Sequence, residues 1–131
     1  MVQAAPAKPD LAAHEAAMRL GTDALVAELR QRLGPRLVAY IAGVSETRAV
    51  HRWAEGTRDI RDAEVTDRLR LVYQVLQLLV ARDADTVAQA WFQGLNPKLE
   101  DRSPARLLRE GELAEVGPQV LAAARAFAAV G

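Results

Sequence analysis

The residues best suited to chemistry gather in one stretch, "GVSETRAVHRWAEG", which runs from Gly43 to Gly56. On a helix that turns by about 100° per residue, its side chains separate into two arcs. The polar arc holds Thr47, Arg48, His51, Arg52 and Glu55, and the apolar arc holds Ala49, Val50, Trp53 and Ala54. The stretch therefore predicts an amphipathic helix over 46–55, with Trp53 in the core and a polar face rich in hydrogen-bond donors.

The polar arc has the chemistry of a surface that contacts DNA. Arg48 and Arg52 lie one helical turn apart, where both guanidinium groups can donate to guanine edges or to phosphates. Ser45 and Thr47 lie at the expected helix start, where their hydroxyls can donate to phosphate beside the positive end of the helix dipole. The DNA-binding candidates are Ser45, Thr47, Arg48, His51, Arg52 and Arg58, with Arg61 as a further backbone contact. The alternative is an ordinary solvated face, and two glutamates in the stretch weaken its positive field.

The same residue types do not predict an enzyme. The two histidines, His14 and His51, are far apart in the sequence and no Cys is present, so no metal-ligand spacing occurs. Ser45 has only His51 as a possible base, and no glycine-rich loop is available to hold a nucleotide phosphate. We therefore expect no catalytic residue, no metal site and no cofactor.

Composition favours one compact domain, or two small helical units that share a core. The 131 residues are 50% hydrophobic, 26% charged and only 5% aromatic. Because Ala, Leu, Val and Arg dominate, closely packed helices are favoured over a sheet. The formal net charge is +0, but residues 30–70 hold nine Arg and six acidic residues. This mildly basic region fits a phosphate-binding surface, and it also fits ion pairing within helices.

Three absences bear on location. The lack of Cys suits a reducing cytoplasm. No apolar run approaches the roughly 20 residues that a membrane span needs, and the first ten residues lack the apolar centre of a signal peptide. We expect a cytoplasmic protein with no membrane partner, in which residues 1–21 form a flexible or helical N-terminal arm.

Helical periodicity extends through nearly the whole chain and predicts an all-α fold of seven or eight helices. The expected helix starts are Thr22, Pro35, Ser45, Asp62, Asp83 or Asp85, Ser103 with Pro104, and Pro118, with Thr22, Ser45, Asp62 and Ser103 as caps. The expected ends are Gly21, Gly34, Gly43, Gly56, about Arg82, Gly94 and Gly111. The short helix before Gly43, the turn "GVS" and the helix after it have the form of a helix-turn-helix, whose second helix enters the major groove of DNA.

Longer segments add a resemblance to a known family. The run "LVAYIAGVSETRAVHRWAEGTRDIRDAEVTDRLRLVYQVLQLL" resembles the Xre-type helix-turn-helix of the MbcA/ParS/Xre family of type II antitoxins. The later run "WFQGLNPKLEDRSPARLLREG" is similar to the toxin-binding domain of that family, with its Trp, Asn-Pro-x-Leu turn, Ser-Pro helix start and Leu-Leu pair before a Gly. The resemblance covers Gly34 to the C-terminus. It implies a helix-turn-helix domain over 22–82 and a small helical toxin-binding unit over 83–131.

The resemblance also implies partners. Family members are commonly encoded beside a RES-domain toxin that consumes NAD⁺, so it implies an antitoxin that neutralises such a toxin and represses its own operon. The toxin-binding positions that it implies are Trp91, Asn96, Pro97, Leu99, Pro104, Leu107 and Leu108, with Leu121 and Phe127 on the last helix. Contact with operator DNA predicts a homodimer, or a larger complex with toxin, because one helix-turn-helix contacts one half-site. Two alternatives stay open: a transcriptional regulator without a toxin, and a helical adaptor that does not bind DNA.

The chain departs from the family pattern in one turn. Glu100 and Asp101 stand where many relatives have glycine after the Asn-Pro-x-Leu motif, which leaves the conformation of that turn open. The large apolar residues of the motif are also typical core residues, so a role in the core and a role in the interface are both open.

Overall fold

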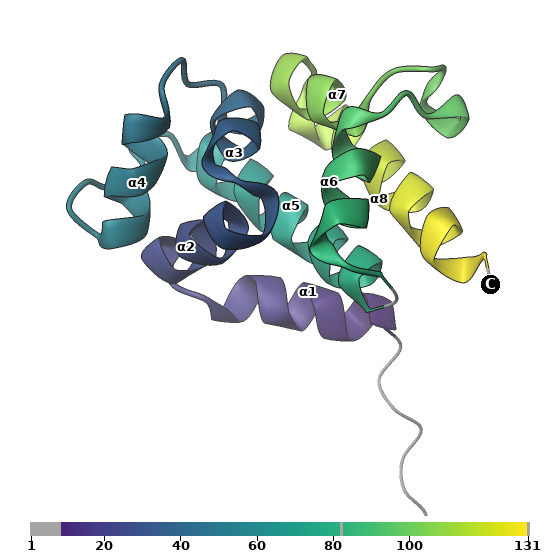
Figure 1. Ribbon diagram of the computed structural model, residues 1–131, viewed down its shortest axis with the longest axis horizontal. Helices are drawn as coiled ribbons and strands as arrows, with labels where there is room; N and C mark the ends of the chain where they lie inside the picture. Colours follow the sequence, from purple (N-terminus) through teal and green to yellow (C-terminus); the bar gives the residue numbers. More distant parts are fainter. Residues whose placement is uncertain (1–8, 82, 131) are drawn as a thin grey trace, which may run out of the picture.

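The structure is a computed structural model that describes residues 9–81 and 83–130 (Figure 1). In those ranges the chain forms α1 (Pro9–Arg19), α2 (Thr22–Leu33), α3 (Pro35–Ala42), α4 (Thr47–Glu55), α5 (Ala63–Val80), α6 (Asp85–Gln93), the 3₁₀ turn η1 (Pro97–Leu99), α7 (Pro104–Glu110) and α8 (Leu113–Ala129). The described residues form no strand, and their one isolated bridge joins Asn96 to Arg102. The predicted all-α fold is therefore confirmed.

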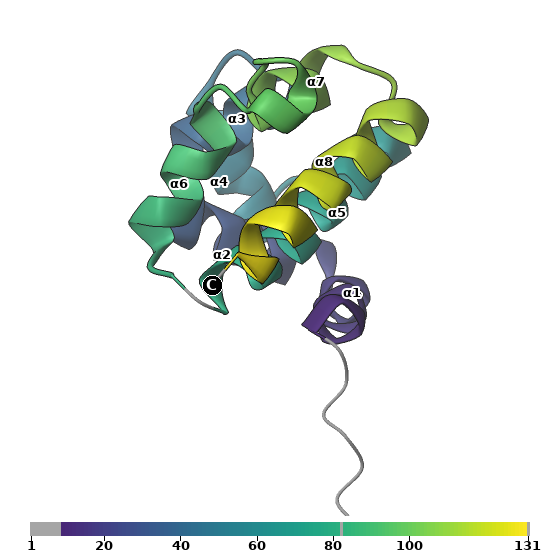
Figure 2. The same cartoon turned by 90° about the vertical axis from the view of Figure 1, so that its right-hand side faces the viewer.

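Helix α5 lies at the centre of the molecule. It packs against α1, α2, α3, α6 and α8, and Figure 2 shows α8 running along it while α1 lies to one side. Half of its residues are buried, among them Leu69, Val72, Leu76 and Leu79. Buried residues of every α-helix belong to one hydrophobic cluster. The two units expected from the sequence therefore share a single core.

Several helix caps and helix ends lie where the sequence predicts them. The Asp62 carboxylate accepts from the Glu64 N–H at 2.9 Å and caps α5, and the Ser103 hydroxyl accepts from the Arg106 N–H at 3.1 Å and caps α7. Gly56 ends α4 with φ of 75°, a left-handed conformation that costs glycine little. These ends depend only on near neighbours, so the sequence predicts them.

Three predicted helix starts are wrong. Ser45 does not cap α4, because the backbone is still extended at Glu46, which is the N-cap. Thr22 is the first residue of α2, and Gly21 is its N-cap. Pro118 lies inside α8, which begins at Leu113. The earlier start of α8 brings buried Val116 and Gly117 against the core, and a Cβ on Gly117 would lie only 3.5 Å from the Leu71 side chain of α5.

The described part of the N-terminal arm is helical and docked. Arg70 of α5 donates to the carbonyl oxygens of Ala17 and Leu20 at 2.9 and 2.8 Å. Asp10 and Arg125 of α8 form an ion pair at 2.9 Å. Residues 1–8, which belong to the same expected arm, lie outside the described residues, as do Arg82 and Gly131 at the ends of the expected units.

Candidate functional site

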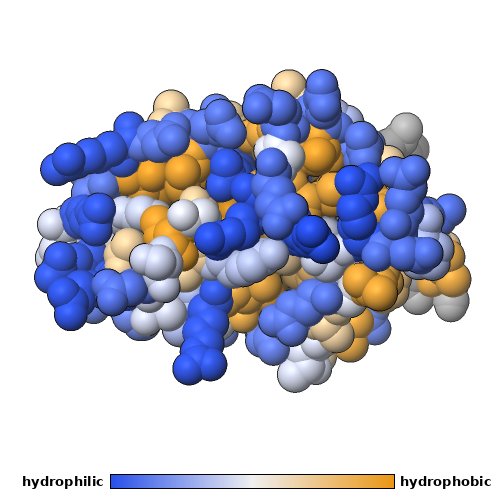
Figure 3. Space-filling model, turned by 90° about the horizontal axis from the view of Figure 1, so that it is seen from above, coloured by the Kyte–Doolittle hydropathy of each residue, from blue (hydrophilic) through white to orange (hydrophobic). Residues whose placement is uncertain are grey.

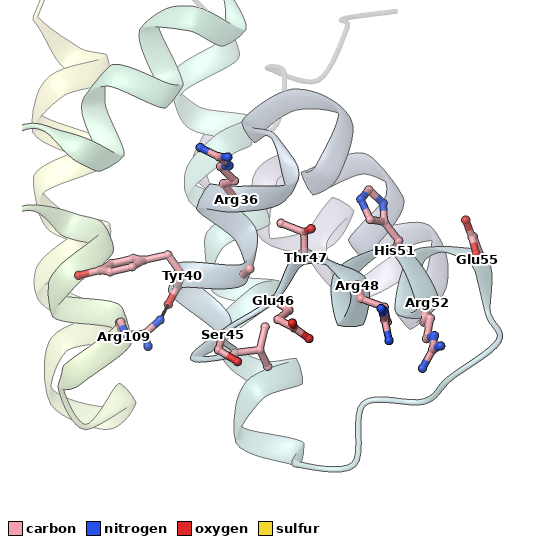
Figure 4. A pocket seen from close by; sticks show the side chains of 12 residues that line it. Arg36, Tyr40, Ser45, Glu46, Thr47, Arg48, His51, Arg52, Glu55 and Arg109 are labelled. Atoms are coloured by element: carbon pink, nitrogen blue, oxygen red, sulfur yellow. Dashed lines mark hydrogen bonds between the residues drawn. The ribbon is translucent and has the colours of Figure 1, made fainter.

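A hollow of about 1030 Å³ opens beside α4 (Figure 4). Its lining comes from α3, the α3–α4 turn, α4 and α7, and consists of Arg36, Ala39, Tyr40, Val44, Ser45, Glu46, Thr47, Arg48, His51, Arg52, Glu55 and Arg109. Five of the six DNA-binding candidates are in this set. The sixth, Arg58, lines an adjacent hollow of about 350 Å³ together with Ser45 and Arg48. The structure therefore brings all six candidates to one region of the surface.

The two faces of α4 are as the sequence predicts. Val50 is fully buried and Trp53 is 5% exposed, and the helix packs against α2 and α3. Arg48 and Arg52 are exposed on the opposite side, and Figure 4 shows their side chains extending in the same direction. The helix therefore presents two guanidinium groups from a firmly anchored backbone.

The α3–α4 turn is held by a residue that the sequence analysis did not identify. Gly43 has φ of 84°, and its N–H bonds back to the last turn of α3. Arg68 of α5, only 8% exposed, donates from Nη1 to the carbonyl oxygen of Ile41 at 2.9 Å. An unpaired carbonyl at a helix end is costly to bury. Arg68 therefore provides a hydrogen-bond donor for a carbonyl group at the end of α3 and links the α3–α4 turn to α5.

His51 is oriented by Arg30 of α2. The His51 Nδ1 lies 3.0 Å from Nη1 of Arg30. Because a guanidinium group only donates, Nδ1 of His51 accepts, and a neutral ring then carries its hydrogen on Nε2. The ring therefore offers one N–H donor through Nε2.

Arginine side chains dominate the charge of the hollow. Four arginines line it, Arg36, Arg48, Arg52 and Arg109, against two glutamates, Glu46 and Glu55. Arg36 and Arg109 were missed because they lie outside the amphipathic stretch, and Arg109 is remote in sequence. Such an excess of positive charge in a concave surface attracts phosphate groups.

Two further features were sought in the described residues, a metal site and a membrane-spanning helix. Residues 9–81 and 83–130 contain no group of three His, Asp or Glu side chains that could hold a metal ion. Over the same ranges, no helix combines the length and apolar character that crossing a membrane requires.

The toxin-binding candidates divide between core and surface. Trp91, Leu99, Pro104, Leu107 and Leu108 are buried, Asn96 and Leu121 are half-buried, and Pro97 and Phe127 are exposed. Trp91 of α6 contacts the rings of Phe92 and Phe127 at centroid distances of 5.3 and 6.4 Å. The buried members hold α6, η1, α7 and α8 together, and the exposed members lie on the surface that these helices form.

The segment from Asn96 to Arg102 closes into a compact loop. The Asn96 side chain accepts from the Lys98 N–H at 2.9 Å, and the Asn96 carbonyl oxygen accepts from the Asp101 N–H at 2.9 Å. Glu100 and Asp101 have φ of 58° and 59°. The turn therefore contains two successive residues in the left-handed conformation, and neither is glycine. Residues with a side chain normally disfavour this conformation.

One exposed apolar residue at this loop was also missed by the sequence analysis. Leu95, directly before the loop, is 75% exposed. It follows the end of α6 and breaks the helical spacing, so periodicity gave no signal for it. An exposed leucine beside a strained loop is a candidate for contact with a protein partner.

Comparisons with known proteins give one informative match. No protein-family model matches the sequence, and the search of curated proteins finds no match. Among solved structures, a chain of the crystal structure of the M. tuberculosis MbcT-MbcA toxin-antitoxin complex is similar, with a TM-score of 0.59 and 29% sequence identity. The alignment covers 79% of this chain and 94% of that chain. This protein is thus MbcA-like in fold and in sequence, which confirms the antitoxin-family resemblance expected from its motifs.

Proposed function

We propose that this protein is the antitoxin of a type II toxin–antitoxin system, that it binds and neutralises a RES-type toxin that consumes NAD⁺, and that it represses its own operon. The observation that carries the proposal is the match to a chain of a toxin–antitoxin complex over 79% of the protein. A match of that extent is longer than either expected unit, so it includes parts of both. The alignment therefore extends across the boundary between the two expected units.

The surface of α4 supports the DNA-binding half. Exposed Arg48 and Arg52 can donate to base edges or phosphates, and Thr47 lies at the helix start beside them. The buried face of α4 and the bond from Arg68 to Ile41 restrict movement of this surface. Because one such helix contacts one half-site, we propose that two copies bind the operator together.

The C-terminal loop supports the toxin-binding half. Leu95 and Phe127 are exposed apolar side chains at 75% and 37%, and Pro97 is exposed in the loop between them in sequence. Asn96 accepts from the N–H groups of Lys98 and Asp101, and these hydrogen bonds hold the loop in one shape. An apolar surface held in a defined shape is suited to a protein partner, because little freedom is lost on binding.

DNA binding is tested with the promoter of the protein's own operon. We expect the double substitution Arg48→Ala and Arg52→Ala to weaken binding at least about 30-fold, since each good base contact contributes roughly 1–3 kcal/mol. The matched control is Arg19→Ala, which removes an exposed arginine of α1 that does not line the hollow. Fluorescence anisotropy over a range of salt concentrations measures the DNA affinity of the double variant and of the control variant. Equal affinities for the two variants would remove the support for this half of the proposal.

Toxin binding is tested with the product of the neighbouring gene. We expect co-expression to yield a stable complex, and Leu95→Glu or Phe127→Glu to weaken it without lowering the thermal stability of the isolated protein. Met18→Glu is the control, because Met18 is 60% exposed on α1. Failure of the unaltered protein both to bind that toxin and to rescue cells from it would contradict the antitoxin role, and DNA binding alone would then indicate a regulator without a toxin.

A further inference from the structure

Arg109 is held against the helix-turn-helix although it belongs to α7. Its Nη1 donates to the carbonyl oxygen of Tyr40 at 2.6 Å, and its guanidinium carbon lies 4.7 Å from the centre of the Tyr40 ring. Figure 4 shows the two side chains together at one end of the hollow, with Arg48 and Arg52 toward the other end. A cation over an aromatic face is attracted to it, and the hydrogen bond restricts the group further. The guanidinium of Arg109 is therefore held in place before any ligand binds.

The charge of Arg109 is not neutralised by the described chain. Arg102 and Arg106, its neighbours in sequence, form ion pairs with Glu100 and Glu110 at 2.8 and 3.1 Å. Within residues 9–81 and 83–130, no carboxylate lies at ion-pair distance from Arg109. The same holds for the three other arginines of the hollow, Arg36, Arg48 and Arg52. The hollow thus holds four guanidinium groups that form no ion pair within the described residues, although Glu46 and Glu55 also line it.

Arg109 also keeps most of its hydrogen-bonding capacity. A guanidinium group has five N–H donors in one plane. In the described structure only Nη1 is used, by the Tyr40 carbonyl. The remaining donors suit the paired oxygens of a phosphodiester, which a planar guanidinium group binds through two parallel hydrogen bonds.

We propose that Arg109 is a DNA-phosphate contact supplied by the C-terminal unit, so that the DNA-binding surface extends from α4 across Tyr40 to α7. This inference rests on the proposed binding of DNA by α4. In Figure 3, which looks down on the side of the molecule where the α3–α4 turn and α7 lie, hydrophilic side chains spread over most of the surface. A recognition helix in the major groove leaves the flanking backbone to neighbouring elements, and Arg109 of α7 lines the same hollow as Arg48 and Arg52.

A contact between Arg109 and phosphate differs from a base contact in two measurable ways. A contact with phosphate is independent of base sequence, so the loss of Arg109 weakens binding to operator and to unrelated DNA by the same factor. It also removes one released counter-ion, so the slope of log affinity against log salt becomes shallower by about 0.9. Loss of a base contact would instead weaken operator binding selectively.

The test compares Arg109→Ala with Arg106→Ala, a matched control three residues earlier on α7 that is exposed and already paired with Glu110. Affinity for operator and unrelated duplexes is measured at several salt concentrations, and thermal unfolding is measured beside it. We expect Arg109→Ala to lower the affinity for both duplexes several-fold and to make the slope of log affinity against log salt shallower. We expect Arg106→Ala to change neither the affinity nor the slope. Arg109→Lys keeps the charge, so we expect it to restore the slope.

The possible outcomes separate this proposal from the one on which it rests. If Arg109→Ala weakens binding but leaves the salt slope unchanged, Arg109 only supports the fold and the phosphate contact is refuted. If Arg109→Ala has no effect while the double variant of Arg48 and Arg52 loses affinity, the DNA surface ends at α4 and this inference alone is wrong. If neither variant changes binding, both proposals fail.

Discussion

Replacing Arg68 with Met should destabilise the protein through the carbonyl group that it leaves unpaired. Met has a similar length and fits the same apolar surroundings, but it cannot donate to Ile41, 2.9 Å away in the wild-type protein. Arg68 also pairs with Glu64 at 3.3 Å, and its Nε is buried without a partner. The substitution therefore combines two losses, the hydrogen bond to Ile41 and the ion pair with Glu64, with one gain, the removal of an incompletely satisfied buried charge.

The expected magnitude follows from these contacts. A hydrogen bond from a charged donor contributes roughly 1.5–3 kcal/mol, and a buried acceptor without a partner costs about 1–3 kcal/mol. The pair with Glu64 adds little, because the Glu64 side chain is 52% exposed and solvent screens it. Removal of the buried charge offsets part of the loss. We expect Arg68→Met to lower the free energy of unfolding by about 2 kcal/mol and Glu64→Gln to lower it by under about 0.5 kcal/mol.

Urea denaturation followed by circular dichroism measures the free energy of unfolding of both variants, and thermal denaturation measures their melting temperatures. The melting temperature of Arg68→Met should fall by roughly 7 °C, and hydrogen exchange should accelerate in the α3–α4 turn. Two results would refute the reasoning. Equal losses for Arg68→Met and Glu64→Gln would show that the ion pair is the important contact, and a stable Arg68→Met would show that the buried charge costs more than its hydrogen bond returns.

Three further predictions concern other parts of the molecule. Glu100→Gly should be more stable than Glu100→Ala by about 1 kcal/mol in urea denaturation, because only glycine accepts φ of 58° without strain; equal stabilities would contradict this. Burial raises the pKa of Tyr73 above 10.0, so the folded state holds the phenol proton more tightly than the unfolded state does. The contribution of Tyr73 to stability should therefore be constant below about pH 10 and fall above it, so the loss of stability above pH 10 should be less steep in Tyr73→Phe. Arg70→Met removes two hydrogen bonds to α1 and should speed hydrogen exchange there about tenfold, with α7 as the unaffected control.

Much of the candidate site was predictable because α4 is a local feature. The spacing of Val50 and Trp53 against Arg48 and Arg52 sets which side chains face the core, whatever the helix packs against. The caps at Asp62 and Ser103 were predictable for the same reason, since each bonds to an N–H two or three residues away.

The start of α8 and the division of the apolar residues between core and surface depend on packing. A proline usually opens a helix, but Pro118 lies within α8 because the residues before it pack onto α5. Among the apolar residues implied by the family motif, the sequence did not separate core from surface. The structure buries Leu107 and Leu108 and leaves Phe127 partly exposed.

The sequence by itself determined the helical pattern and the composition of the polar face of α4, because both depend on residues three or four positions apart. Only the tertiary structure decided what surrounds that face. Arg109 reaches the Tyr40 carbonyl across 69 residues of sequence, and Arg68 reaches Ile41 across 27. Contacts of this kind arise where helices meet in the shared core, and periodicity along a single helix contains no information about which helices meet.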